Sequence, residues 1–355
     1  MTTGRVAATP IRLPTEAQSA QKWTMTEPTY RAVVCEELGP PGRLQLRRLP
    51  RVPLNPGTVR VALKAAGINF PDLLTIQGLY QHRPQLPFMP GAEAAGIVTE
   101  VAAGVIGIDV GQKVIARMRT GGYAEEAVAP ASQIMPLPEG FSFAEGATFL
   151  VAHMTAYHAL KTRAAIAPGQ TLLVLGAAGG VGLAAVQMGK VLGARVLAAA
   201  SSEEKLRAAV RHGADATIDY SREPIEDGVK RTTSGEGADV VLDPVGIAQD
   251  AALRCVAPDG KLLIAGFAGG TIPAYAANRI LLKGCTVIGV RTGEAGRRHP
   301  EMRARELEAL LALAAQGLVR PFVSARFPLQ GYAQAMRRLE DRQAIGRIAL
   351  EISPE

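Results

Sequence analysis

Hydrophobic and polar positions divide the chain into stretches of different texture. In residues 58–65, apolar side chains alternate with small or polar ones, which is the period of a strand with one buried face. Further strands are expected at 31–35, 95–101 and 113–116, with Gly and Pro dense between them. Short strands separated by turns indicate a β-rich, barrel-like domain.

A second texture begins at Ser142. Ser142 and Glu145 have the spacing of a capping box, which predicts a helix start, and a long apolar helix is expected after it. Strands and amphipathic helices then alternate, and the six expected strands are 171–175, 195–200, 216–218, 240–242, 261–265 and 286–290. This pattern predicts a doubly wound α/β fold with a six-stranded parallel sheet covered on both faces.

The alternation stops after Thr292. Residues 301–316 are expected to form a helix that ends before Gly317, and 346–350 a closing strand. Because the six-strand unit is already complete, we assign this tail to the first domain. The predicted division is 30–152 with 293–355 for one domain and 153–292 for the other.

Residues 1–29 show no periodic pattern and no apolar core of a secretory signal. We interpret them as a disordered N-terminal extension, with Met25 as an alternative start. An organelle-targeting segment is the other interpretation.

Composition narrows the classes of partner. Apolar residues make up 48% of the 355 residues, and no apolar run approaches the roughly 20 residues of a membrane span, so no membrane partner is expected. The net charge of +7 is scattered and aromatics are only 5%, which argues against nucleic acid. The three cysteines are far apart, which favours a reducing, cytoplasmic location.

A glycine-rich turn, GAAGGVG at 176–182, lies between an expected strand and an expected helix. Its backbone amides at a helix N-terminus suit a pyrophosphate, which a side chain at Gly179 would block, while Gly182 allows close packing of helix on strand. Aligned to G-x-G-x-x-G, the turn has Ala177 at the first glycine position, so the match is imperfect. The predicted cofactor contacts in this turn are Ala178, Gly179, Gly180, Val181 and Gly182.

The end of the second strand indicates which dinucleotide binds. Ala200 stands where an NAD-binding chain has a carboxylate for the ribose hydroxyls. Ser201 and Lys205 instead offer a hydroxyl and a positive charge suited to a 2′-phosphate, and Tyr220 is expected to close the same pocket. These residues favour NADPH.

Further motifs follow in order: AGINFPD at 66–72, GLY at 78–80, PFMPGAEAAG at 87–96, DPVG at 243–246 and GRI at 346–348. With the glycine-rich turn, they resemble the medium-chain dehydrogenase/reductase superfamily, and within it the zinc-independent quinone oxidoreductase group related to ζ-crystallin. The resemblance extends from residue 30 to 350. It implies a GroES-like catalytic domain, a Rossmann domain and a homodimer formed through the sixth strand.

The resemblance also implies site residues. Asn69 and Thr155 would lie near the nicotinamide, and the remaining cofactor contacts would be Gly266, Phe267, Val290, Thr292 and Arg347. This chain departs from the family at Leu74, where many members have a tyrosine, so one cofactor or substrate contact is expected to differ.

No metal site is expected. Zinc members of the superfamily have a histidine at the position of Ala92, and alanine cannot be a ligand, whereas a catalytic zinc needs about three protein ligands. The histidines show no ligand spacing, and a structural role for Glu93 is favoured over a catalytic one. Without a Lewis acid, the alkoxide formed during alcohol oxidation is hard to stabilise. Quinones and activated enones accept hydride more readily, because their charge delocalises.

The sequence therefore predicts hydride transfer from NADPH to a quinone or α,β-unsaturated carbonyl. Asn69 would position the nicotinamide or substrate, and Tyr80 would either donate a hydrogen bond to the developing oxyanion or only pack beside it. Two alternatives remain: an enoyl-thioester reductase, which IQGLY at 76–80 resembles, and a non-catalytic NADPH-binding protein.

Overall fold

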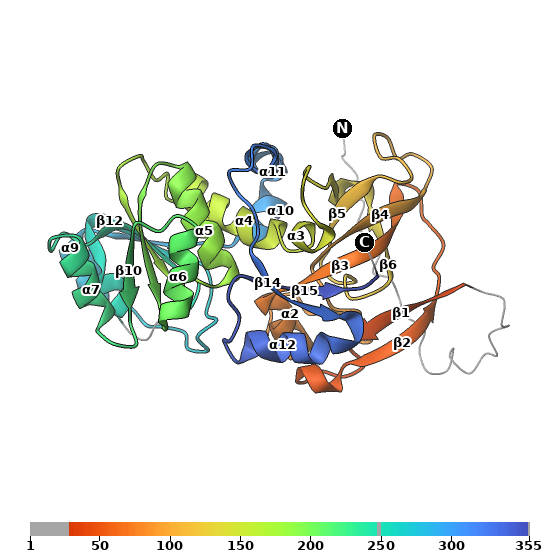
Figure 1. The fold of residues 1–355 in the computed structure, drawn as a ribbon, viewed down its shortest axis with the longest axis horizontal. Coiled ribbons are helices and arrows are strands. Elements are labelled where there is room, and N and C mark those ends of the chain that lie inside the picture. Colours follow the sequence, from red (N-terminus) through yellow and green to blue (C-terminus); the bar gives the residue numbers. More distant parts are fainter. Residues whose placement is uncertain (1–27, 247–249, 354–355) are drawn as a thin grey trace.

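The computed structural model describes residues 28–246 and 250–353. The chain folds into two bodies side by side, each built on its own sheet (Figure 1). The C-terminal segment returns from the second body to the first. The α/β class and the two-sheet organisation predicted from the sequence are confirmed.

The first body is a β-rich domain of the GroES type. Its seven-stranded sheet has the order β14-β15-β3-β4-β5-β7, and β6 pairs with β3 beside this path. The strands are β3(Thr58–Ile68), β4(Glu93–Val101), β5(Lys113–Arg117), β6(Glu126–Pro130), β7(Ile134–Pro136), β14(Val323–Pro328) and β15(Arg347–Glu351). A ribbon of β1(Thr29–Val34) and β2(Gln45–Pro50) and the helices α2(Phe70–Ile76) and α12(Tyr332–Glu340) complete this body.

The second body is a Rossmann sheet of six parallel strands in the order β10-β9-β8-β11-β12-β13. Its strands are β8(Thr171–Leu175), β9(Arg195–Ala200), β10(Ala216–Asp219), β11(Ala238–Asp243), β12(Val256–Ile264) and β13(Thr286–Gly289). The helices between them are α5(Gly180–Val191), α6(Glu203–Arg211), α7(Ile225–Thr232), α8(Ala251–Arg254) and α9(Ala277–Lys283). All six predicted strands are present, and β8 and β11 flank the point where the strand order reverses.

One expectation was wrong. The capping box at Ser142 and Glu145 forms, but the helix after it is not continuous: α3(Phe143–Gly146) ends early, α4(Leu150–Tyr157) begins anew, and residues His158–Arg163 form a π-helix. The physical reason is that residues at the break between α3 and α4 bond to distant parts of the chain. The Thr148 carbonyl accepts a hydrogen bond from Arg347, and the Val151 amide donates to Glu93, so neither group is left for one continuous helix.

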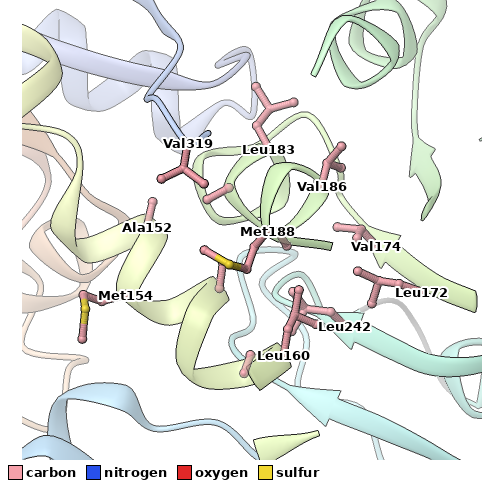
Figure 2. Close-up of a cluster of buried hydrophobic side chains, with 14 of the residues drawn as sticks. Ala152, Met154, Leu160, Leu172, Val174, Leu183, Val186, Met188, Leu242 and Val319 are labelled. Atoms are coloured by element: carbon pink, nitrogen blue, oxygen red, sulfur yellow. The ribbon is translucent and has the colours of Figure 1, made fainter. Parts of the chain in front are cut away.

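The helices between the two sheets pack together in one hydrophobic core. Residues of α4, α5 and the strands β8 and β11 pack together in Figure 2, and Val319, from the segment after α11(Pro300–Ala315), joins them. Leu310 and Ala314 of α11 are buried in the same cluster. The domain boundaries at 152/153 and 292/293 stay predictions, because this core joins helices on both sides of them.

The predicted N-terminal extension lies outside the described residues except for its last two positions. Within 28–246 and 250–353, no helix combines the length and the hydrophobicity that crossing a bilayer requires.

Candidate active site

The predicted cofactor residues gather at one edge of the Rossmann sheet. The glycine-rich turn follows β8, Ser201 follows β9 and Tyr220 follows β10. Gly266 and Phe267 follow β12, and Val290 and Thr292 follow β13. Because parallel strands end at the same edge, this is the position at which doubly wound sheets bind nucleotides.

The glycine-rich turn has the backbone that a pyrophosphate site needs. Gly176 takes the left-handed conformation (φ +58°), so it makes the tight turn, and Ala177 at the first glycine position of the motif is no obstacle. Gly179 is the N-cap of α5, and a Cβ there would meet only the Gly176 carbonyl oxygen, at 3.4 Å. A Cβ on Gly182 would lie 2.3 Å from that oxygen, so the helix packs directly on the turn.

The residues predicted to bind a 2′-phosphate lie together. The Lys205 ammonium donates to the Ser201 hydroxyl at 3.1 Å and to the Arg342 carbonyl at 3.1 Å. Burial raises the pKa of Tyr220, and the Ser201 side chain and the positive charge of Arg342 oppose that rise, which places both beside the phenol. The cluster offers hydroxyls and cations to an anion. Arg342 was missed, since it lies 137 positions from Lys205 in the sequence.

A buried polar network, which we call the hub, lies in the first body next to the turn. The Arg347 guanidinium donates to Asn69 Oδ1 at 2.7 Å and to Glu93 Oε1 at 2.6 Å, and its Nε donates to the Thr148 carbonyl at 3.0 Å. Glu93 also accepts from the Val151 amide at 2.9 Å. Burial raises the pKa of Glu93, and the positive charge of Arg347 opposes this rise.

A second carboxyl lies below Asn69 in the same network. Asp72 accepts from the backbone amide of Asn69 at 2.9 Å and from the Tyr123 hydroxyl at 2.8 Å. Burial raises the pKa of Asp72 to about 7, and the two hydrogen bonds oppose it. Burial also holds the Tyr123 pKa well above its usual value. Asn69 is therefore fixed from below at the start of α2. Tyr123 carried no sequence signal.

The hub contacts the dinucleotide turn directly. The Gly346 amide donates to the Ala178 carbonyl at 2.7 Å. A Cβ on Gly180 would lie 2.8 Å from both Cδ and Nη1 of Arg347. Glycine at position 180 therefore allows Arg347 to pass over the turn and reach Asn69. Through this contact, residues predicted to hold the phosphates and the nicotinamide form one assembly.

The remaining predicted residues have these positions. The Thr155 hydroxyl donates to the Val151 carbonyl at 2.7 Å. The backbone amide of the same Val151 donates to Glu93 in the hub. Phe267 is partly exposed, Val290 is buried, and the buried Thr292 hydroxyl has no hydrogen-bond partner among the described residues. The backbone of Tyr80 donates to the Leu74 carbonyl, and its ring lies within electrostatic range of Arg117 and Arg297.

The two buried histidines, His153 and His158, contact protein groups. His153 contacts the Phe149 carbonyl and Gln187, and burial lowers its pKa to about 4. His158 bonds Glu306 at 2.8 Å. Over the described ranges, no three His, Cys, Asp or Glu side chains are grouped so that they could hold a metal ion.

Comparisons with known proteins identify the family of both bodies. Residues 55–139 match the family described as "Alcohol dehydrogenase GroES-like domain", and residues 180–313 match "Zinc-binding dehydrogenase". A "Quinone oxidoreductase-like protein 2 homolog" from Nematostella vectensis is 38% identical over 94% of this chain and 92% of its own length.

Solved structures are similar over both bodies. A probable oxidoreductase from Mycobacterium abscessus is 35% identical with a TM-score of 0.83, covering 92% of this chain and 100% of that one. The Escherichia coli quinone oxidoreductase complexed with NADPH is 30% identical with a TM-score of 0.81, covering 91% and 100%. The chain thus belongs to the medium-chain dehydrogenase/reductase superfamily, in its zinc-independent quinone oxidoreductase group.

Proposed function

We propose that this protein is an NADPH-dependent reductase that transfers hydride to a quinone or an α,β-unsaturated carbonyl without a metal. The observation that carries the proposal is the contact between Gly180 and Arg347, which joins the dinucleotide turn to the buried Asn69. A dinucleotide lying along that turn would have its reactive end beside the hub. NADPH supplies a hydride when it is bound.

The preference for NADPH rests on the end of β9. Ser201, Lys205 and Tyr220 offer donors there, and Ala200 offers no carboxylate to repel a phosphate. Replacing Lys205 with Ala should weaken NADPH binding by roughly tenfold, as expected for a lost charged hydrogen bond, and leave NADH binding unchanged. Equal loss for both nucleotides would contradict a 2′-phosphate site. Calorimetric titration of each nucleotide measures this.

The chain's own residues have simple roles in the reduction. Asn69, whose Oδ1 accepts from Arg347 and whose backbone amide donates to Asp72, is held in one orientation beside the nicotinamide or the acceptor. The acceptor gains a hydride on carbon and a proton on the resulting enolate or phenolate. The Tyr80 hydroxyl, which has no hydrogen-bond partner among the described residues, donates to that oxygen. Unchanged turnover in Tyr80→Phe would leave Tyr80 as a packing residue.

One set of assays with different hydride acceptors distinguishes the proposed reductase from its two alternatives. Wild-type protein is assayed for NADPH and NADH oxidation with menadione, with an enone and with crotonyl-CoA, each with and without a chelator. Menadione or enone reduction that survives the chelator supports the proposal, whereas reduction of crotonyl-CoA alone favours the enoyl-thioester reductase. Tight NADPH binding with no turnover on any acceptor favours a non-catalytic binding protein.

We also propose a homodimer formed through β13. This strand ends the six-stranded sheet, and its backbone has no neighbouring strand on one side in the described chain. Leu281 and Leu282, on the preceding α9, are 80% and 82% exposed. A second copy would pair edge to edge about a twofold axis and cover them. Light scattering should give twice the 37.3 kDa mass, and Leu282→Lys should give a monomer.

The remaining expectations accompany this proposal. The three cysteines are all buried and free, which accords with a reducing, cytoplasmic location. The proposed partner is a small-molecule acceptor, and neither nucleic acid nor a membrane is expected.

A further inference from the structure

Four arginines, which we call the arginine cluster, come together beside Tyr80: Arg117, Arg119, Arg297 and Arg303. Arg117 ends β5, and Arg119 follows it in the loop. Arg297 lies on α10(Thr292–Arg298), and Arg303 lies on α11, which Figure 1 places between the two bodies. Residues separated by almost 200 positions of sequence thus contribute to one positively charged region.

The cluster is connected to the proposed reaction site. Arg117 faces Glu93 across the paired strands β4 and β5, and Glu93 belongs to the hub. Arg117 also interacts electrostatically with Tyr80 and with Arg303. Arg297 interacts electrostatically with Arg119 and with Tyr80 as well. The cluster therefore extends from the residue that binds Asn69 to the proposed hydrogen-bond donor.

Over the described residues, three of these cations lack the counter-ion that the buried Arg60 and Arg347 have. Arg297 pairs with Glu294, but Arg117, Arg119 and Arg303 form no ion pair or side-chain hydrogen bond with any described residue. Arg303 Nη1 is fully buried and has no hydrogen-bond partner within residues 28–246 and 250–353. A buried donor left unpaired costs about 1–3 kcal/mol, which a fold tolerates where the group has a purpose.

The acidic residues near the cluster do not neutralise it. Glu306 acts on Arg303 electrostatically, but its carboxylate accepts from His158 at 2.8 Å and from Thr162. Burial, with Arg303 as the next cause, lowers the pKa of Arg117 from 12.5 to about 10, so Arg117 stays charged at neutral pH. An anion bound here would relieve the crowding of positive charge.

We propose that the acceptor reduced at this site carries a carboxylate, which Arg303 and Arg117 hold while its conjugated carbonyl faces Tyr80. The inference rests on the function proposed above and narrows its acceptor to a carboxylate-bearing enone or quinone. A carboxylate suits the site because guanidinium groups bind its two oxygens in one plane. In the reaction, the alkene carbon β to the ketone gains the hydride, the α carbon gains a proton from water through Tyr80, and the dinucleotide loses two electrons.

The test compares two acceptors that differ only in charge. The values of kcat/KM with NADPH are measured for (E)-4-oxopent-2-enoate and for its methyl ester, in wild type, Arg303→Met and Arg305→Met. Arg305 is the matched control, since it is exposed on the same helix and its replacement changes the net charge equally. Wild type and Arg305→Met should prefer the acid by roughly tenfold or more, and Arg303→Met should lose that preference.

A binding measurement separates this inference from the function on which it rests. Calorimetric titration with 4-oxopentanoate, which cannot be reduced at a C=C bond, should show binding to wild type loaded with NADP⁺ and at least tenfold weaker binding to Arg303→Met. NADPH affinity should be equal in both proteins. Arg303-dependent binding without turnover of any acceptor would keep the carboxylate site and reject the reductase.

Other results overturn the inference. Menadione reduction by wild type, with equal kcat/KM for acid and ester, would reject the carboxylate site and keep the reductase. Weaker NADPH binding in Arg303→Met would assign the cluster to the cofactor. If Arg303→Met lost activity with crotonyl-CoA alone, the arginine cluster would be assigned to the phosphates of coenzyme A. Absence of both turnover and binding would reject both proposals.

Discussion

Arg347 and Arg303 are both largely buried guanidinium groups, yet their surroundings differ in kind. Arg347 has a carboxylate, an amide oxygen and a backbone carbonyl as partners, and the carboxylate is held in turn by the Val151 amide. Arg303 has one nitrogen fully buried without a partner and another arginine within electrostatic range. A network that is complete within the chain fixes a structure, whereas one that is incomplete is suited to a ligand.

The largest effect is expected from breaking the hub. Arg347→Met would leave the Glu93 carboxylate buried without its cation, and such losses cost about 3–5 kcal/mol in the free energy of unfolding. Urea unfolding measures this loss. The double variant Arg347→Met with Glu93→Gln should recover part of it, because the uncompensated charge is gone. Wild-type stability in the single variant would mean that the Glu93–Arg347 ion pair does not stabilise the fold.

The hub should also make stability depend on pH. The pKa of Asp72 is raised in the folded state from 3.8 to about 7, so protonation of Asp72 stabilises the fold. That contribution is fully present below pH 3.8 and is lost as pH rises towards 7, by about 1.4 kcal/mol per pH unit. Burial raises the Glu93 pKa as well, so Glu93 acts in the same direction.

Asp72→Asn should therefore flatten the fall in unfolding free energy between pH 4.5 and 6.5. Asp215→Asn is the control, since the pKa of Asp215 is lowered in the folded state and its contribution changes only at more acidic pH. Urea unfolding at three pH values distinguishes the two variants. An unchanged slope in Asp72→Asn would show that Asp72 stays ionised over this range.

A smaller effect should follow from separating the hub from the dinucleotide turn. In Gly180→Ala, the new Cβ would meet Arg347, which cannot move without losing its contact to Asn69. We expect NADPH affinity to fall roughly tenfold, equal to about 1.4 kcal/mol. Gly293→Ala is the matched control, because a Cβ at Gly293 has open space. Equal affinities in the two variants would mean that Arg347 does not limit access to the turn.

The smallest effect on stability should come from the arginine cluster. Arg303→Met removes a cation whose nitrogen has no partner and relieves repulsion on Arg117. The free energy of unfolding should stay equal or rise by up to about 1 kcal/mol, in contrast to the loss in Arg347→Met. Thermal and urea unfolding provide the measurement. A loss comparable to that of Arg347→Met would erase the difference between the two regions.

Local features of the site could be read from the sequence with good accuracy. The glycine-rich turn, the residues after β9 and the capping box at Ser142 are each formed by neighbours in the chain, and local spacing determines their geometry. The same holds for the six parallel strands, whose apolar runs reflect burial on both faces. The break between α3 and α4 was not foreseen, because distant residues cause it.

The partners of Asn69 and Arg303 depended on the tertiary structure. Arg347 meets Asn69 across 278 positions and Glu93 across 254, and no spacing rule relates such residues. The family resemblance implied that Asn69 and Arg347 belong to the site, but their direct bond follows from the return of β15 to β3. The sequence by itself determined the elements and their order. Long-range packing decides whether a guanidinium has a partner, so only the folded chain distinguished Arg347 from Arg303.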